Sequence, residues 1–114
     1  VIARFEREIK EYFLSDRTHS SGLPTVKDRA VKLNMSPDYL SDMLKRQTGM
    51  SAQEHIHVVL IDHAKTQLIG TQKSVKEIAY SLGFDYPQYF NKLFKAKTGM
   101  TPIEYRRSGL TPNR

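Results

Sequence analysis

The strongest fold signal in this chain lies in residues 74–106, which read SVKEIAYSLGFDYPQYFNKLFKAKTGMTPIEYR. Ser74, followed three positions later by Glu77, is a helix-start signal of the capping-box type. The apolar residues behind it recur at helical spacing: Val75, Ile78, Ala79 and Leu82. Gly83 is suited to the turn that follows, and Pro87 to the first turn of another helix. The stretch therefore predicts a short helix, a turn and a second helix.

The same pattern occurs earlier in the chain, which indicates an internal duplication. Residues 48–51 (Thr-Gly-Met-Ser) return 50 positions later as residues 98–101 (Thr-Gly-Met-Thr). The apolar positions of the short helix return at an offset of 49: Val26, Ala30 and Leu33 as Val75, Ala79 and Leu82. The second copy therefore has one extra residue, near Asp85 and Tyr86. One copy alone could equally be a plain helical hairpin, but two copies with matching turns favour a pair of helix-turn-helix units.

Helix-start and helix-stop signals along the chain predict an all-α fold of seven helices. The predicted ranges are 1–15, 25–34, 37–48, 52–69, 75–82, 87–98 and 102–107. The predicted organisation is a first helix-turn-helix unit (1–50), a linking helix (51–70), a second unit (71–107) and a C-terminal tail (108–114). An 18-residue linking helix would be about 27 Å long. That length could hold two helices in adjacent major grooves of DNA, which are about 34 Å apart.

The second helix of each unit has a polar outer face at equivalent positions of the repeat. The predicted inner stripes are Leu40, Met43, Leu44 and Gln47 in one helix, and Phe90, Leu93 and Phe94 in the other. The outer faces are Asp38, Ser41, Asp42 and Lys45, and Gln88, Asn91, Lys92 and Lys95.

The two outer faces differ in chemistry. Gln and Asn can bond to adenine, and Lys can reach guanine or a phosphate, so the second face suits a major groove. An ordinary solvent-exposed face has this composition too. Asp can accept a hydrogen bond from cytosine but repels phosphates. Asp38 and Asp42 are therefore either selective base readers or a sign that the first unit binds weakly and the second carries more of the affinity.

The net charge of +6 is concentrated at one end of the chain. Residues 1–86 carry 12 basic and 11 acidic side chains, whereas residues 87–114 carry six and one. A basic end favours a polyanionic partner, nucleic acid first, although a solvated basic surface would account for the charge alone equally well. The absence of cysteine excludes a disulfide framework and a cysteine nucleophile. No apolar run approaches the roughly 18–20 residues that span a membrane, and we expect no membrane partner.

These features resemble the DNA-binding domain of the AraC/XylS family of bacterial transcription regulators. The most specific agreement is in residues 74–79, 82–85, 88–95 and 98–106, close to the family signature throughout. The first unit and the connector also agree in order and spacing, so the resemblance covers about residues 2–107.

The resemblance implies double-stranded DNA as partner, and transcriptional control, usually activation through contact with RNA polymerase. Base-facing positions of the family correspond to Asp38, Ser41 and Asp42, and to Pro87, Gln88, Asn91 and Lys92. Phosphate contacts are expected near helix starts, at Thr25, Ser74 and Lys76. We assign Lys45, Arg46 and Lys95 to phosphates as well.

The chain departs from the family in two ways. The linking helix often carries Arg where this chain has Leu60, and the acidic pair of the first reader helix is unusual. Family members also usually carry a sensor or dimerisation domain, for which this chain has no room. We therefore expect the C-terminal piece of a larger regulator, which acts in the bacterial cytoplasm at the nucleoid.

An enzyme is the first alternative. His55 and His57 project from nearly opposite sides of a helix and His63 is also out of line, so no pair has the spacing of a helical zinc site. His19 stands alone in a polar loop. Three tyrosines are interpreted as packing or backbone contacts: Tyr80, Tyr86 and Tyr89. With no phosphate loop or nucleophile motif, we expect no catalysis, no metal and no cofactor.

A protein-interaction module is the second alternative. The first helix is amphipathic and could dock a partner through Ile2, Phe5, Ile9, Tyr12 and Phe13. Packing of this helix on the first unit is the preferred interpretation. Binding to DNA that weakens steeply with salt would distinguish the regulator from the module.

Overall fold

A computed structural model describes residues 2–14 and 22–109 of the chain. This part consists of seven helices without a strand, which confirms the predicted fold class. The helices are α1 (Ile2–Leu14), α3 (Val26–Lys32), α4 (Pro37–Thr48), α5 (Ala52–Gly70), α6 (Val75–Ser81), α7 (Pro87–Thr98) and α8 (Pro102–Gly109).

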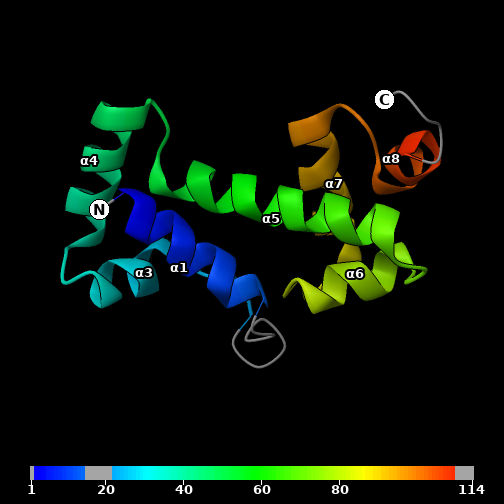
Figure 1. Cartoon of the computed structure of the whole chain (residues 1–114), viewed down its shortest axis with the longest axis horizontal. Helices are drawn as coiled ribbons and strands as arrows, with labels where there is room; N and C mark the ends of the chain where they lie inside the picture. Colours follow the sequence, from blue (N-terminus) through cyan, green and yellow to red (C-terminus); the bar gives the residue numbers. More distant parts are fainter. Residues whose placement is uncertain (1, 15–21, 110–114) are drawn as a thin grey trace.

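Helix α5 lies at the centre and joins two groups of helices (Figure 1). It packs against α1 and α4 in one group and against α6 and α8 in the other, while α3 packs on α4 and α7 on α6. Four α5 residues of an i+4 stripe are almost fully buried: Ile56, Leu60, Ala64 and Leu68. Leu60, where the family often has Arg, is therefore a core residue here. In Figure 1, α4 and α7 both rise towards the upper edge of the molecule, and α7 passes behind α5.

Helix α1 lies mainly along α5, so its predicted packing on the first unit is met only in part. The ring of Phe5 meets the ring of His55 edge-on, with centroids 6.0 Å apart, and Phe13 stacks on His63 at 5.9 Å. Contact with the first unit comes from Tyr12, whose ring lies 5.0 Å from the guanidinium carbon of Arg29. Helix α1 thus buries its apolar face against α5 and contacts α3 through Tyr12.

Capping boxes set the starts of three helices, and the one at Ser74 is the box that the sequence analysis identifies. The hydroxyl of Ser51 accepts from the amide of Glu54, and that carboxylate accepts from the amide of Ser51, both at 3.2 Å. The same reciprocal bonds start α6 and α8: Ser74 with Glu77, and Thr101 with Glu104. Each box satisfies amides that the first turn of a helix leaves without partners.

The turn of the first unit ends α3 with two backbone hydrogen bonds. The amide of Asn34 donates to the carbonyl of Val31 at 3.1 Å, and that of Met35 to Ala30 at 2.9 Å. This is a Schellman motif, which requires a left-handed residue after the helix. Asn34 supplies it with a φ of 59°. The helix is therefore shorter than the predicted 25–34, because Thr25 is its cap and residues 33–34 form the turn.

The turn of the second unit has the same motif. Gly83 donates to Tyr80 at 3.0 Å and Phe84 donates to Ala79 at 3.1 Å. Gly83 has a φ of 103°. Residues 82–86 separate α6 from α7, against residues 33–36 between α3 and α4, so the extra residue lies where the repeat predicts it.

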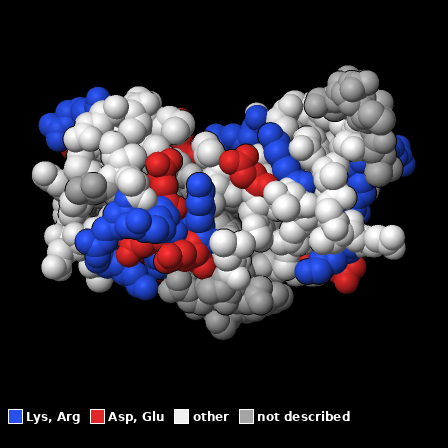
Figure 2. Space-filling model, in the orientation of Figure 1, with Lys and Arg blue, Asp and Glu red and all other residues white. Residues whose placement is uncertain are grey.

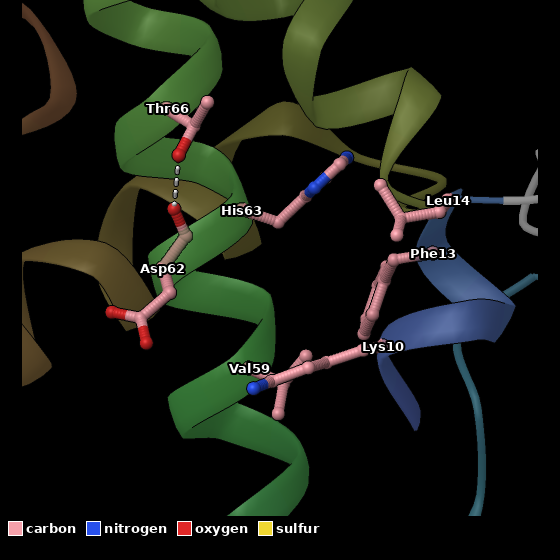
Figure 3. Close-up of a pocket in the computed structure, with 7 residues that line it drawn as sticks. All are labelled: Lys10, Phe13, Leu14, Val59, Asp62, His63 and Thr66. Carbon is pink, nitrogen blue, oxygen red and sulfur yellow. Dashed lines mark hydrogen bonds between the residues drawn. The ribbon is translucent and has the colours of Figure 1, made fainter. Parts of the chain in front are cut away.

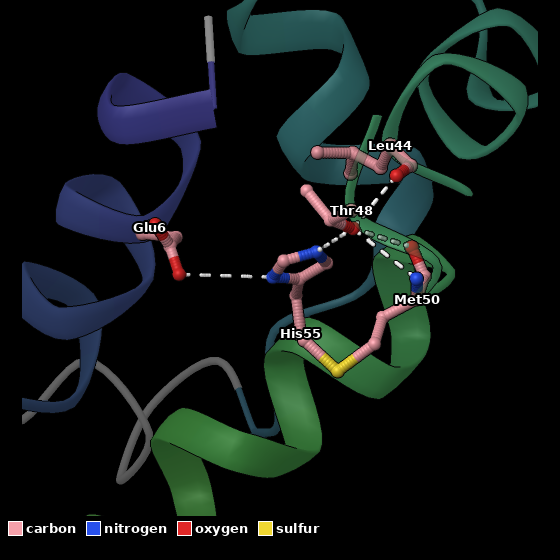
Figure 4. A network of polar contacts seen from close by, with 5 residues as sticks. All are labelled: Glu6, Leu44, Thr48, Met50 and His55. Atoms are coloured by element: carbon pink, nitrogen blue, oxygen red, sulfur yellow. Dashed lines mark hydrogen bonds and ion pairs between the residues drawn. The ribbon is translucent and has the colours of Figure 1, made fainter. Parts of the chain in front are cut away.

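The junction of α4 with α5 is fixed by a polar network around a buried histidine (Figure 4). The hydroxyl of Thr48 donates to the carbonyl of Leu44 at 2.7 Å and accepts from the amide of Met50 at 3.2 Å. It also lies 2.9 Å from Nε2 of His55, whose Nδ1 faces the carboxylate of Glu6 at 3.7 Å. His55 is 3% exposed, so this network locks α1, α4 and α5 together.

Helix α8 ends beyond the predicted residue 107, at Gly109. Arg106 donates from Nε to the carbonyl of Leu68 at 2.8 Å, and Ser108 donates to the carbonyl of Tyr105 at 2.9 Å. The first bond attaches α8 to the last turn of α5, and the second ties the Ser108 side chain to the preceding turn of α8.

Candidate nucleic-acid interface

Helix α4 presents the polar face that the sequence predicts. The hydroxyl of Ser36 accepts from the amide of Tyr39 at 3.1 Å, and Pro37 occupies the first turn. Leu40, Met43 and Leu44 are buried. The outer positions lie together on the opposite side. Ser41 is half-buried, and the other three are exposed: Asp38, Asp42 and Lys45.

Helix α7 presents the equivalent face. Phe90 and Phe94 are fully buried, and Leu93 is partly buried. The outer side chains are all exposed: Gln88, Asn91, Lys92 and Lys95. Pro87 is partly buried at the start of the helix. The four outer positions correspond to the outer positions of α4 in the repeat. Both units therefore present polar side chains from the same part of their second helix.

The predicted inner position of Gln47 is wrong, because this side chain is exposed. It lies in the last turn of α4, beyond the buried Leu44. Its counterpart in the second unit, Lys97, is exposed as well. The last turns of α4 and α7 therefore extend past the core, and helical spacing alone does not reveal where the packing partners end.

Exposed tyrosines lie beside these faces. Tyr80, Tyr86 and Tyr89 are 45%, 57% and 60% exposed, so packing does not account for these side chains, and the other interpretation, backbone contacts, stays a prediction. The rings of Tyr86 and Tyr89 meet edge-on with centroids 5.8 Å apart. Tyr39, the repeat counterpart of Tyr89, is 55% exposed. The repeat of a tyrosine beside each outer face was the available signal, because exposed aromatic rings are often contact residues.

The candidate phosphate-binding residues are all exposed: Thr25, Lys45, Arg46, Ser74, Lys76 and Lys95. Thr25 and Ser74 cap α3 and α6, so their oxygens already accept from Asp28 and Glu77 amides. A hydroxyl has one hydrogen to donate besides the bonds that it accepts. These two residues can therefore cap a helix and donate to a phosphate at once.

The charge is distributed differently over the two units. Helix α7 carries Lys92, Lys95 and Lys97 and no acidic residue, whereas α4 combines Asp38 and Asp42 with Lys45 and Arg46. On the face drawn in Figure 2, basic and acidic side chains are intermixed around α1. The excess positive charge is therefore larger in the second unit than in the first.

The histidines have separate surroundings in the described part of the chain. His55 faces Thr48, whereas Nε2 of His57 and Nε2 of His63 lie 2.9 Å from the amide nitrogens of Gln53 and Gln67. Burial lowers the pKa of His57, and the charge of Lys97 lowers it further. Within the described residues, no three His, Cys, Asp or Glu side chains are placed to hold a metal ion. His19 lies outside these residues.

Two of the hollows beside α5 flank its middle. One, of about 210 Å³, lies between α1 and α5, where Phe13 and Leu14 face His63 (Figure 3). The other, of about 280 Å³, lies between α5 and Lys97 of α7. Neither adjoins the outer faces of α4 or α7. In the described ranges, no helix has the combined length and apolar character needed to cross a membrane.

Residues 29–108 match a family described as a helix-turn-helix domain. The transcriptional regulatory protein YesN of Bacillus subtilis is 44% identical over 66% of this chain and 21% of its own length. The HTH-type transcriptional activator RhaR of Yersinia pestis is 35% identical over 60% of this chain and 23% of its own.

A solved structure has the same fold. It is the C-terminal domain of AraT, a response regulator from Geobacillus stearothermophilus, with 32% identity and a TM-score of 0.75. The match covers 91% of this chain and 84% of that structure. The chain thus spans about a quarter or less of the two curated relatives but most of the isolated domain.

Proposed function

Since the chain belongs to the AraC-type helix-turn-helix family of DNA-binding transcription regulators, we propose that it binds specific double-stranded DNA with α4 and α7 in adjacent major grooves. One observation carries this proposal: α4 and α7, which belong to the two groups of helices that α5 joins, present polar faces at repeat-equivalent positions. Helix α5 has 19 residues and is therefore about 28 Å long. This is close to the roughly 34 Å between successive major-groove faces on one side of DNA.

The base-reading roles follow from the donors and acceptors at each position. In α7, the Gln88 and Asn91 amides can each bond to an adenine edge, and Lys92 can donate to guanine. In α4, Asp38 and Asp42 can accept from cytosine, and Ser41 can do either. Pro87 lacks an amide hydrogen, so its role is restricted to contact of its ring with a base edge or sugar.

The second unit supplies most of the affinity in this proposal. Lys95 and Lys76 lie in a unit with a positive excess, whereas Lys45 and Arg46 share α4 with two carboxylates. Each cation that neutralises a phosphate releases counterions and strengthens binding, and each carboxylate near the backbone opposes this. The division of the chain into units 1–50 and 71–107 with a linker at 51–70 belongs to this proposal.

The wider role proposed is that of a bacterial transcription activator without catalysis or cofactor, which acts at the nucleoid through RNA polymerase. RhaR, one of the relatives, is an activator, and the chain covers only 23% of it. The remaining length of such relatives leaves space for a sensor or dimerisation domain N-terminal to this one.

The test is selection of bound duplexes from a random DNA pool with this chain. Two enriched blocks about one helical turn apart, roughly 10 base pairs, are expected. A single block would leave α7 as the only reader. Absence of binding even at low salt would overturn the proposal and favour a protein-interaction module.

Matched substitutions then separate base reading from phosphate binding. Gln88→Ala or Asn91→Ala should relax the preference at one base pair, with a loss of about 1–3 kcal/mol on the selected site. Lys95→Ala should weaken all sequences alike and reduce the salt slope by about 1. Lys45→Ala is the repeat-equivalent control. An unchanged base preference in the Gln88 and Asn91 variants would mean that this face does not read DNA.

A further inference from the structure

The turn of the second helix-turn-helix unit touches the first unit through its backbone. A Cβ atom built on Gly83 would lie 2.8 Å from the carbonyl carbon of Gly22 and 2.9 Å from the amide nitrogen of Leu23. Gly22 precedes α3, and Gly83 follows α6. Figures 1 and 3 both show the C-terminal end of α1 beside α6. The two units therefore meet at a second place besides α5.

The Gly22 side of this contact is held firmly on the first unit. The hydroxyl of Tyr12 donates to the carbonyl of Gly22 at 2.7 Å. Tyr12 is 5% exposed and its ring lies against Arg29 of α3, which is also buried. Leu23 packs against the hydrophobic core, and Pro24 is buried. An atom added at Gly83 would thus meet anchored backbone and not the end of a flexible side chain.

The Gly83 side is equally fixed. Its amide bonds to Tyr80, and the next residue, Phe84, bonds to Ala79 and is 9% exposed. The same motif in the first unit places Asn34 at a left-handed φ, and Asn34 is exposed to solvent. A Schellman turn of this type therefore accepts a side chain when nothing lies opposite. At position 83 the neighbouring unit lies opposite.

We propose that the Gly22–Gly83 contact is a brace that fixes the distance and angle between α4 and α7, so that Gly83 determines which spacing of two DNA half-sites the chain accepts. A single helix can bend gently along its length, and two groups joined only by α5 could rock about it. A second contact away from α5 prevents this rocking. Base identity is read by side chains of α4 and α7, whereas the brace selects the spacing. The effect on DNA spacing rests on the proposed function, whereas the existence of the brace does not depend on it.

The first test measures the brace without DNA. The chain has no cysteine, so Arg46→Cys and Ala96→Cys place two spin labels at exposed, repeat-equivalent positions of α4 and α7. In the parent, a narrow distance distribution is expected from pulsed electron paramagnetic resonance. Gly83→Ala should broaden it and shift its mean on the order of 1 Å, because non-bonded carbon atoms prefer about 3.5–4.0 Å.

Gly99→Ala is the matched control. Gly99 has a φ of 82°, so alanine is strained there too, but no atom lies within 4 Å of its added Cβ. The control should keep the parent distribution. Equal distributions for Gly83→Ala and Gly99→Ala would overturn the brace. If Gly83→Ala does not fold by circular dichroism, Tyr12→Phe removes the bond to Gly22 without adding an atom, and it should broaden the distribution; a parent-like distribution in that variant would also overturn the brace.

The second test measures the consequence on DNA, with duplexes whose two selected blocks are moved apart or together by one base pair at a time. The parent and Gly99→Ala should prefer one spacing, and Gly83→Ala should show a flatter or displaced preference with unchanged affinity for a single block. A parent-like spacing profile in folded Gly83→Ala would overturn the role in spacing. If the parent enriches no two-block site, the proposed function fails, and the distance measurement still decides whether the brace exists.

Discussion

The two helix-turn-helix units of this chain share their helix ends and turns, which form a common frame, but differ in their core residues and in their outer faces. Each unit ends its first helix with a Schellman turn and its second helix with a glycine at a φ of about 81° or 82°. In each, a threonine hydroxyl bonds back to the helix and to the methionine after the glycine. The frame comprises about 30 residues of duplicated sequence whose hydrogen bonds are all local.

The interiors of the two units differ. The second unit contains a chain of aromatic contacts, in which Phe90 lies between Phe84 and Phe94, and Phe94 meets Tyr105 at 5.5 Å. Beside the first unit, His55 of α5 is the repeat counterpart of Tyr105, and it bonds to Thr48 instead. The outer faces differ still more, since carboxylates occupy positions that hold an amide and a lysine in α7. Because local hydrogen bonds fix the helix ends and turns, the core residues and the outer-face residues can differ between the two units.

The largest expected effect comes from the cores. Phe94 and Leu44 are both 0% exposed. Phe94→Ala should reduce the free energy of unfolding by about 3–5 kcal/mol and Leu44→Ala by about 2–5 kcal/mol. We expect the Phe94 variant to lose more, because it also interrupts contacts with Phe90 and Tyr105. Urea denaturation measures both. A greater loss for Leu44→Ala would mean that the aromatic contacts add no stability to the second unit.

A medium effect is expected at the starts of α4 and α7. Ser36 caps α4, whereas Tyr86 precedes α7 without a side-chain cap. Ser36→Ala should therefore cost about 1 kcal/mol of unfolding free energy, and Tyr86→Ser should gain up to about 1 kcal/mol by supplying the missing cap. Tyr86→Ala, which removes the ring without adding a cap, is the control. If thermal unfolding gives Tyr86→Ser a Tm no higher than that of Tyr86→Ala, the missing cap at the start of α7 does not lower stability.

The smallest effect concerns acid stability. Hydrogen bonds from the amides of Ser51, Ser74 and Thr101 hold the pKa values of Glu54, Glu77 and Glu104 below their ordinary value of 4.5. A lowered folded-state pKa stabilises the protein fully above 4.5, and this contribution is lost as the pH falls through the folded-state value. Two of the three carboxylates belong to the second unit.

Between pH 6 and pH 3, the Tm of the double variant Glu77→Gln/Glu104→Gln should therefore fall less than the Tm of the parent. The single variant Glu54→Gln should also show a reduced fall in Tm, but the reduction should be smaller than in the double variant. Both effects are small, because the carboxylates are fully exposed. Parallel Tm curves for parent and double variant would mean that these boxes contribute nothing to the acid dependence.

Most helix ends were predictable from the sequence, and most contacts between helices were not. The sequence predicts α4 and α7 with their observed bounds, because Pro37, Pro87, Gly49 and Gly99 act on their own turns. It does not predict that α1 lies along α5, or that Arg106 bonds to Leu68 across 38 residues. Periodicity identifies the polar faces, but it misplaced Gln47 because it cannot show how far a packing partner extends.

By itself, the sequence determined the seven helices, the duplicated frame and the family, since caps, turns and apolar spacing act over three or four residues. Only the tertiary structure decided how α4 and α7 are placed relative to one another. That placement depends on the burial of α5 against both groups, on the His55 network and on the approach of Gly83 to Gly22. Contacts between residues 61 positions apart leave no periodic signal. The sequence explains Gly83 by the left-handed turn that it forms, whereas its close approach to the backbone of Gly22 is visible only in the tertiary structure.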